Sequence, residues 1–112
     1  MSRDESYLVD MLVSARAILE YVGEMGEAEF EQNEMTKDAV LRRMEILGEA
    51  AKRVSDEFKS LHPEIDWSGP ARMRDVLIHQ YRRVDLGEVW RAVAEDIPAL
   101  VPRLEAIVPE EE

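Results

Sequence analysis

The 112-residue sequence lacks cysteine, so neither disulfides nor thiol chemistry contributes to its fold or function. It also lacks any stretch that approaches the ~20 apolar residues of a membrane span, and its polar, acidic N-terminus has no apolar signal-peptide core. We therefore expect a soluble, cytoplasmic protein without membrane partners. The length predicts one domain, residues 1–112, of which residues 109–112 form an acidic tail.

Basic residues are scarce. The chain has 14 Lys and Arg against 25 Asp and Glu, for a formal net charge of −11. An acidic chain of this kind is a poor general binder of polyanions, and the simplest role of the acidity is solubility. One stretch, Arg72–Arg83, departs from the rest because it holds four arginines and one acid. Its local charge is +3, so the other residues carry −14 to give the total of −11. This contrast predicts a local site for an anionic ligand.

Apolar residues recur at alternating steps of four and three along three long segments, which is the spacing of one helical face. The segments are Leu8–Val22, Val40–Leu61 and Leu86–Ile107. Strand-like alternation of useful length is absent from the sequence. The pattern predicts an all-α fold, an up-and-down bundle of four to five helices with additional short helical turns.

Local signals predict where these helices begin and bend. Thr36 is a good N-cap for the second long helix, and Ser55 can cap a fresh turn after a break. Gly48 costs ~1 kcal/mol relative to alanine within a helix, which we explain by the close approach of another helix. Ser68 is expected to cap the helix that carries the arginine-rich stretch. Pro98 predicts a kink or break near residues 96–98.

Residues 24–34 hold five glutamates and no base. Such a run is more often a solvated face than a metal site, so we expect a short helical turn or loop with Phe30 as its anchor in the core. The sequence contains no glycine-rich phosphate loop, nucleophile triad or metal-ligand spacing. It therefore predicts no metal site and no cofactor.

The arginine-rich stretch contains the pattern Arg74-x4-His79-x-Tyr81. Together with its flanks, this pattern resembles the HepT-like branch of the HEPN ribonucleases, whose hallmark is an arginine followed after four to six residues by histidine. The resembling flanks are Ile46–Ala50, His62–Trp67, Asp85–Trp90 and Ile97–Leu100.

The resemblance implies a HEPN-like helical domain that acts as a metal-independent endoribonuclease on RNA. Members of the family are usually the toxin of a toxin–antitoxin pair and are active as homodimers in which the two motifs face each other. The antitoxin is a minimal nucleotidyltransferase of the MntA type. That enzyme can silence the toxin by attaching AMP to the tyrosine of the motif, which here is Tyr81.

The residue types fit this chemistry independently. Histidine has an ordinary pKa of about 6.5, which suits removal of a proton from a ribose 2′-hydroxyl. We assign His79 as general base or acid and Arg74 as the clamp on the phosphate and transition state. The neighbouring arginines are expected to bind flanking phosphates, and Tyr81 to stack on a base or orient the phosphate. These neighbouring arginines are Arg72, Arg82 and Arg83.

Two features set conditions on the assignment. Asp75 stands where the family more often has asparagine. A carboxylate only accepts hydrogen bonds, so it can hold Arg74 or His79, or weaken the electrostatic attraction of RNA to the site.

Residues five apart on a straight helix differ by roughly 140° in direction, so Arg74 and His79 do not converge on one phosphate. Either the helix loosens near His79, or a second protomer supplies part of the site.

Two other classes of function stay open on sequence alone. The same bundle can be a non-catalytic module that binds nucleotide or RNA and serves a nucleotidyltransferase, or a plain helical dimerisation protein. In these alternatives His79 is a histidine hydrogen-bonded to backbone, and the arginines pair with the many glutamates. His62, beside Pro63, is expected to be structural.

Overall fold

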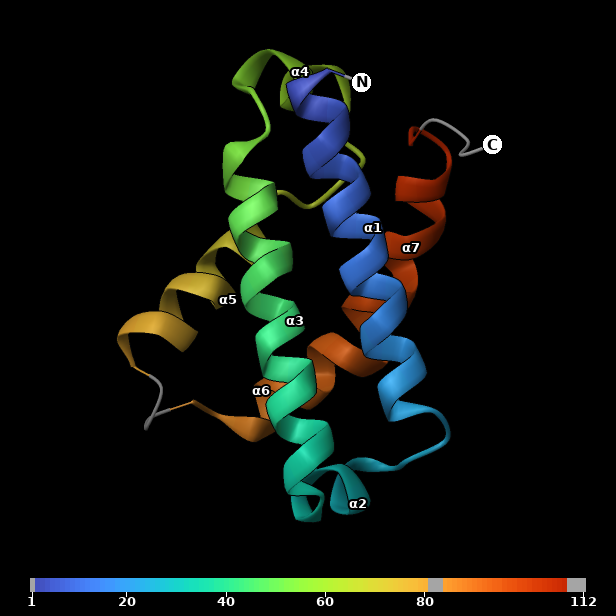
Figure 1. The fold of residues 1–112 in the computed structure, drawn as a ribbon, viewed down its shortest axis with the longest axis vertical. Helices are drawn as coiled ribbons and strands as arrows, with labels where there is room; N and C mark the ends of the chain where they lie inside the picture. Colours follow the sequence, from blue (N-terminus) through green and yellow to red (C-terminus); the bar gives the residue numbers. More distant parts are fainter. Residues whose placement is uncertain (1, 81–83, 109–112) are drawn as a thin grey trace.

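The computed structural model describes residues 2–80 and 84–108, and those residues form helices with no strand among them. The elements, in chain order, are α1 (Arg3–Val22), α2 (Glu27–Gln32), α3 (Glu34–Arg53), α4 (Asp56–Leu61), α5 (Ser68–His79), α6 (Leu86–Arg91), the π-helical turn η2 (Ala92–Asp96) and α7 (Ile97–Glu105). α1 and α3 run in opposite directions, and α6, η2 and α7 form a third long element that returns beside α1 (Figure 1). The all-α bundle predicted from the sequence is confirmed. No described helix combines the length and hydropathy of a membrane span.

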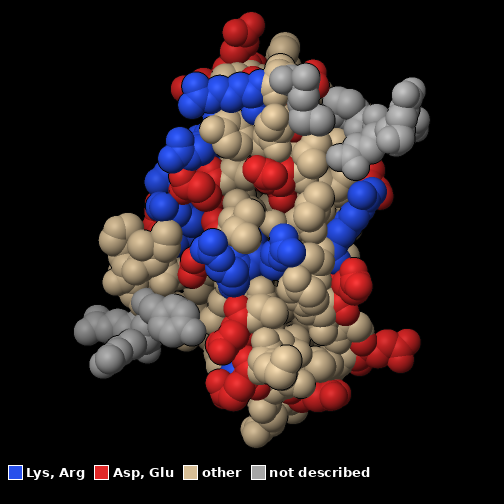
Figure 2. Space-filling model, in the orientation of Figure 1, with Lys and Arg blue, Asp and Glu red and all other residues tan. Residues whose placement is uncertain are grey.

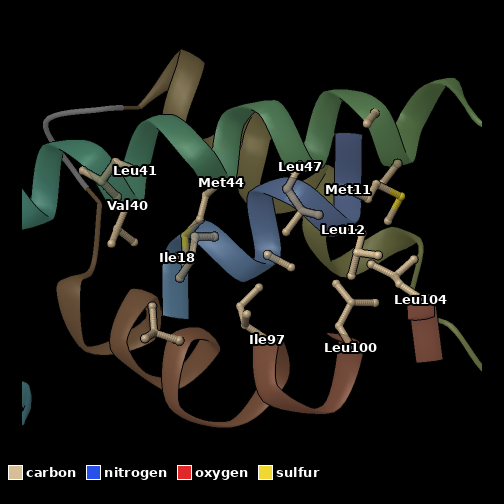
Figure 3. Packing of buried hydrophobic residues seen from close by; sticks show 14 of the residues in the cluster. Met11, Leu12, Ile18, Val40, Leu41, Met44, Leu47, Ile97, Leu100 and Leu104 are labelled. Carbon is tan, nitrogen blue, oxygen red and sulfur yellow. The ribbon is translucent and has the colours of Figure 1, made fainter. Parts of the chain in front are cut away.

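The core lies where the apolar stripes of α1, α3 and α7 meet (Figure 3). Each stripe has the four-three spacing seen in the sequence, because only that spacing keeps side chains on one face of a helix. The labelled buried side chains are Met11, Leu12 and Ile18 from α1, Val40, Leu41, Met44 and Leu47 from α3, and Ile97, Leu100 and Leu104 from α7.

The acidic segment after α1 is held by one aromatic side chain. Phe30 of α2 is 0% exposed, and its ring centroid lies 5.4 Å from that of Trp90 in α6. Most of the glutamates around it are exposed. Phe30 is therefore the anchor that the sequence predicted, and it joins α2 to the C-terminal element.

The predicted start of α3 was wrong by three residues. The N-cap is Asn33, whose side-chain oxygen accepts a hydrogen bond from the Thr36 amide at 3.0 Å, and Thr36 lies inside the helix. Asparagine caps as well as threonine does, and the apolar stripe begins only at Val40, so periodicity does not locate the start. The break after α3 is confirmed, because the Ser55 hydroxyl caps α4 by accepting from the Phe58 amide at 3.2 Å.

The C-terminal element bends as predicted, but the bend precedes the proline. The turn Ala92–Asp96 is π-helical, and Pro98 sits in the first turn of α7, where its missing N–H costs least. Val89 before the wide turn, Val93 within it, and Ile97 and Leu100 after it are all buried. Both halves thus face one core.

Candidate active site

α5 carries the predicted motif and begins at an unexpected cap. Ser68 is already helical, and the Asp66 carboxylate accepts from the Gly69 amide at 2.9 Å and from the Ser68 hydroxyl at 3.3 Å. Ser68 as the cap was therefore wrong, because Ser68 is the first helical residue and the Asp66 carboxylate accepts from the Gly69 amide of the first turn. The helix continues to His79, close to the predicted range.

α5 packs mainly on α3, through a contact that only glycine permits. A Cβ at Gly48 of α3 would overlap the Arg74 Cβ and the Pro70 carbonyl oxygen of α5. Gly48 therefore lets the two backbones approach, as the sequence predicted. The Cβ of Arg74 then lies directly against α3. Leu77 is the buried residue of α5 and joins the core.

The Arg74 guanidinium is held between two carboxylates. Its Nη2 lies 2.9 Å from the Glu49 Oε2 of α3, and its Nη1 lies 3.2 Å from the Asp75 Oδ1. The side chain is only 23% exposed. Its Nε is buried, with no hydrogen-bond partner among the described residues. The guanidinium is thus fixed in place rather than free in solvent.

These contacts belong to an alternating chain of charges. Arg53 contacts Glu49 at 2.6 Å, and Lys52 contacts Asp75 at 3.3 Å, so three cations alternate with two anions around Arg74. The hydrogen bonds from Arg74 and Lys52 hold the pKa of Asp75 below its ordinary value. The hydrogen bond from Arg53, aided by the charge of Arg74, lowers the pKa of Glu49. Both carboxylates are therefore ionised at neutral pH. The five side chains of this charge network together carry one net positive charge.

The His79 ring is folded back along α5. Its Nδ1 lies 2.9 Å from the main-chain carbonyl oxygen of Asp75, and a carbonyl oxygen only accepts, so Nδ1 carries the hydrogen. In the neutral ring Nε2 is then the atom with the free lone pair. The residue is exposed at the end of the helix. A backbone contact of this kind was also expected of a structural histidine; here it fixes the tautomer of an accessible imidazole.

Asp75 links the two principal residues of the motif. Its carboxylate holds Arg74, while its main-chain oxygen holds His79. Among the described residues no hydrogen bond or ion pair joins Arg74 to His79 directly, and α5 is helical as far as His79. The helix therefore does not unwind before the histidine.

The other predicted site residues are placed only in part. Arg72 is exposed and lines a hollow of about 440 Å³ between α5 and the α6–α7 element, whereas Arg74 lines a different hollow. Tyr81, Arg82 and Arg83 lie outside the described residues. His62 is held as a structural residue, with Nδ1 3.1 Å from Glu64 and the ring 4.6 Å from that of Phe58.

Three residues of α3 next to the motif were missed as site residues. Glu49 and Lys52 contact the motif from α3, more than twenty residues before it in the chain, and Arg53 reaches it only through its ion pair with Glu49. The spacing of Glu49 and Arg53, four apart on a helix, signalled an ion pair. Nothing in the sequence signalled that Arg74 would join it.

Known proteins match this sequence over most of the chain. The family model described as "Ribonuclease HepT-like" matches residues 11–107. The chain belongs to the HepT-like ribonuclease family. A probable ribonuclease HepT of Thermococcus cleftensis is 43% identical over 92% of this chain and 94% of its own length. A putative RNase of Methanocaldococcus jannaschii is 32% identical over the same shares.

A second Methanocaldococcus jannaschii protein matches the chain over only part of its own length. This gamma-glutamylcyclotransferase and putative RNase is 41% identical over 93% of this chain but only 47% of its own length. No solved structure matches the chain significantly. For this HepT-like chain, family membership therefore comes from sequence, and the residue contacts come from the fold described above.

Proposed function

We propose that the protein is a metal-independent endoribonuclease whose reaction uses Arg74 and His79. The observation that carries the proposal is the hydrogen bond between His79 Nδ1 and the Asp75 carbonyl oxygen, which leaves Nε2 as the acceptor of an exposed ring, on the helix that also carries the anchored Arg74. Membership of a ribonuclease family supports RNA as the substrate.

In the proposed reaction His79 Nε2 takes the proton from a ribose 2′-hydroxyl. The 2′-oxygen then attacks the adjacent phosphorus, and the bond from phosphorus to the 5′-oxygen breaks. The leaving 5′-oxygen takes a proton from an imidazolium or from water, so the products are a 2′,3′-cyclic phosphate and a 5′-hydroxyl end. Arg74 stabilises the charge that builds up on the phosphate oxygens. Arg72, Arg82 and Arg83 are proposed to bind flanking phosphates.

The direct test is cleavage of single-stranded RNA in EDTA. We expect His79→Ala to lower the rate by about 10²- to 10⁴-fold, as for loss of a general base, and Arg74→Ala by a similar order. His62→Ala is the matched control, because it removes the other histidine and leaves the site untouched. Equal rates for the unchanged protein, His79→Ala and Arg74→Ala would refute these roles.

We further propose that the active form is a homodimer in which one copy supplies Arg74 and the other His79. The roughly 140° between residues five apart on a helix supports this, since α5 stays helical through His79. Mixing Arg74→Ala with His79→Ala chains tests it. Half of the dimers are then mixed, and each has one intact site, so about a quarter of the activity should return. Sites contained within one copy would give no recovery.

We propose that the protein is a toxin silenced by a partner nucleotidyltransferase that attaches AMP to Tyr81. The place of Tyr81 two residues after His79 supports this, because a bulky anion there would repel RNA. Mass spectrometry after incubation with ATP and the partner should find AMP on Tyr81. Label that survives Tyr81→Phe would contradict the assignment. A growth assay with and without the partner tests the toxin role.

A second function has one observation in its favour. Both terminal nitrogens of Arg74 already contact carboxylates, so the site has less free positive charge than the motif alone indicates. A non-catalytic nucleotide- or RNA-binding partner of a nucleotidyltransferase fits that charge. Protein that binds RNA in EDTA without ever cleaving it would favour this alternative.

A further inference from the structure

The helix α3 runs between α1 and α5 in Figure 1. Residues of these three helices line an open hollow of about 320 Å³. This volume falls within the ~300–1,000 Å³ of pockets that hold small organic ligands. Each helix contributes one face to it, since its lining residues recur at helical spacing. Its lining includes Tyr7 of α1, Ile46, Glu49 and Arg53 of α3, and Arg74 and Ile78 of α5.

The charges around the hollow balance. Three arginines line it, and so do three carboxylates, and the face of α1 and α3 shows blue and red atoms side by side (Figure 2). Arg42 contacts Glu45 at 3.2 Å, while Arg53 and Arg74 share Glu49. A phosphate bound in the hollow, in addition to the one proposed at Arg74, would need a surplus of positive charge, which the hollow lacks. A neutral ligand with hydrogen-bond donors and acceptors on its edge fits better.

The hollow also offers apolar surface. Tyr7, Ile46 and Ile78 line it, and Ile78 is 46% exposed, so its apolar side chain is accessible to a ligand. The Arg3 guanidinium near the Tyr7 phenol lowers the pKa of that tyrosine, and the Tyr7 side chain is partly buried and packs against the hydrophobic core. The ring is therefore a fixed aromatic surface beside charged groups. Nucleobases have this combination of flat apolar faces and polar edges.

We infer that the hollow is a nucleobase subsite, which takes the base next to the phosphate held by Arg74 and stacks it against Tyr7. Arg74 borders the hollow, so a nucleotide whose phosphate lies on the guanidinium has its base within reach of the hollow. The carboxylates accept from N–H groups on the edge of the base, and the arginines donate to its carbonyl or ring nitrogen atoms. This inference rests on the proposed ribonuclease function.

The experiment uses a short single-stranded RNA with a mapped cleavage site. A set of oligonucleotides replaces one nucleotide at a time, on either side of the cut, with an abasic ribose. One abasic position should lower kcat/KM by about 5- to 150-fold, which corresponds to the ~1–3 kcal/mol of base–aromatic stacking. Tyr7→Ala should lower cleavage of the complete RNA to the same extent and have no further effect on that abasic RNA. Tyr7→Phe should retain activity.

Tyr21→Ala is the matched control, since Tyr21 is the exposed tyrosine at the other end of α1, where its hydroxyl accepts from Arg43. It should cleave both RNAs as the unchanged protein does. The inference is overturned if no abasic position matters, or if Tyr7→Ala lowers cleavage of complete and abasic RNA equally. A change in oligomeric state of Tyr7→Ala in light scattering would also overturn it, because the hollow would then be an interface between copies.

Binding separates this inference from the proposed reaction. The affinity of His79→Ala for the same fluorescein-labelled oligonucleotides is measured by anisotropy and requires no cleavage. If the unchanged protein never cleaves RNA, the ribonuclease proposal fails. The subsite is still supported if one abasic position lowers the affinity for RNA and the substitution Tyr7→Ala removes that difference in affinity. Equal affinities for all oligonucleotides would overturn the subsite alone.

Discussion

Gly48 of α3 faces Arg74 of α5 so closely that the glycine hydrogen occupies the only room between the two backbones. Helix propensity alone predicts that Gly48→Ala stabilises α3 by ~1 kcal/mol. We expect the opposite sign, because the added methyl group must push α5 away, and overpacking of this kind costs about 1–3 kcal/mol. Urea unfolding measures the change. Gly26→Ala, where a Cβ meets no atom within 4 Å, is the control. A stabilised Gly48→Ala protein would show that the contact is not close.

Asp75→Asn should strengthen RNA binding. The substitution removes the charge that pairs with Arg74 and Lys52 but keeps the main-chain oxygen that holds His79. Exposed ion pairs are worth about 0.2–1 kcal/mol, so we expect up to about a fivefold gain in affinity with an unchanged pH profile of cleavage.

The control for this gain is Glu105→Gln, which makes the same change in net charge at the distant Arg16–Glu105 pair. Titration of labelled RNA measures both variants. Equal gains would assign the effect to overall charge, and a loss with Asp75→Asn would show that its carboxylate positions Arg74 productively.

Stability should fall in acid partly through Glu49 and Asp75. The neighbouring cations lower both pKa values in the folded state, so the folded chain binds protons less readily than the unfolded chain does. This contribution is fully present above the unfolded values near pH 4 and is lost as pH falls through the lower folded values. Thermal unfolding between pH 6 and pH 3 should show a smaller acid-induced drop in Tm for Glu49→Gln than for the unchanged protein. Parallel curves would contradict the coupling.

Phe30→Ala should destabilise the protein by about 3–5 kcal/mol, since it leaves a cavity against Trp90. Met35→Ala is the control, because Met35 is 85% exposed in the next helix. Calorimetry or urea unfolding measures both. A cost below about 1 kcal/mol for Phe30→Ala would mean that α2 is not anchored to the core through this ring.

The sequence predicted the features that local spacing controls. The stripes of α1, α3 and the C-terminal element, the break at Ser55 and the special place of Gly48 all follow from neighbours within a few turns. The caps Asn33 and Asp66 were missed because several polar residues stand near each helix start and only the folded chain shows which one reaches the amides.

The site was predicted less completely for a related reason. Arg74 and His79 are adjacent enough in sequence to form a motif, whereas Glu49 and Tyr7 come from other helices and meet it only through packing. The distance in sequence between these residues leaves no local signal. The roles assigned to Arg74, His79 and Tyr81 stay predictions.

The attachment of α5 mainly to α3 has a consequence for local unfolding. Apart from Leu77, few of its side chains are fully buried, so α5 can open as a unit while α1 and α3 remain paired. In native-state hydrogen exchange its amides should report an opening free energy well below that of global unfolding. RNA bound at Arg74 should raise the opening free energy of α5. The exchange rate of the α5 amides then measures how much of the site is occupied by RNA.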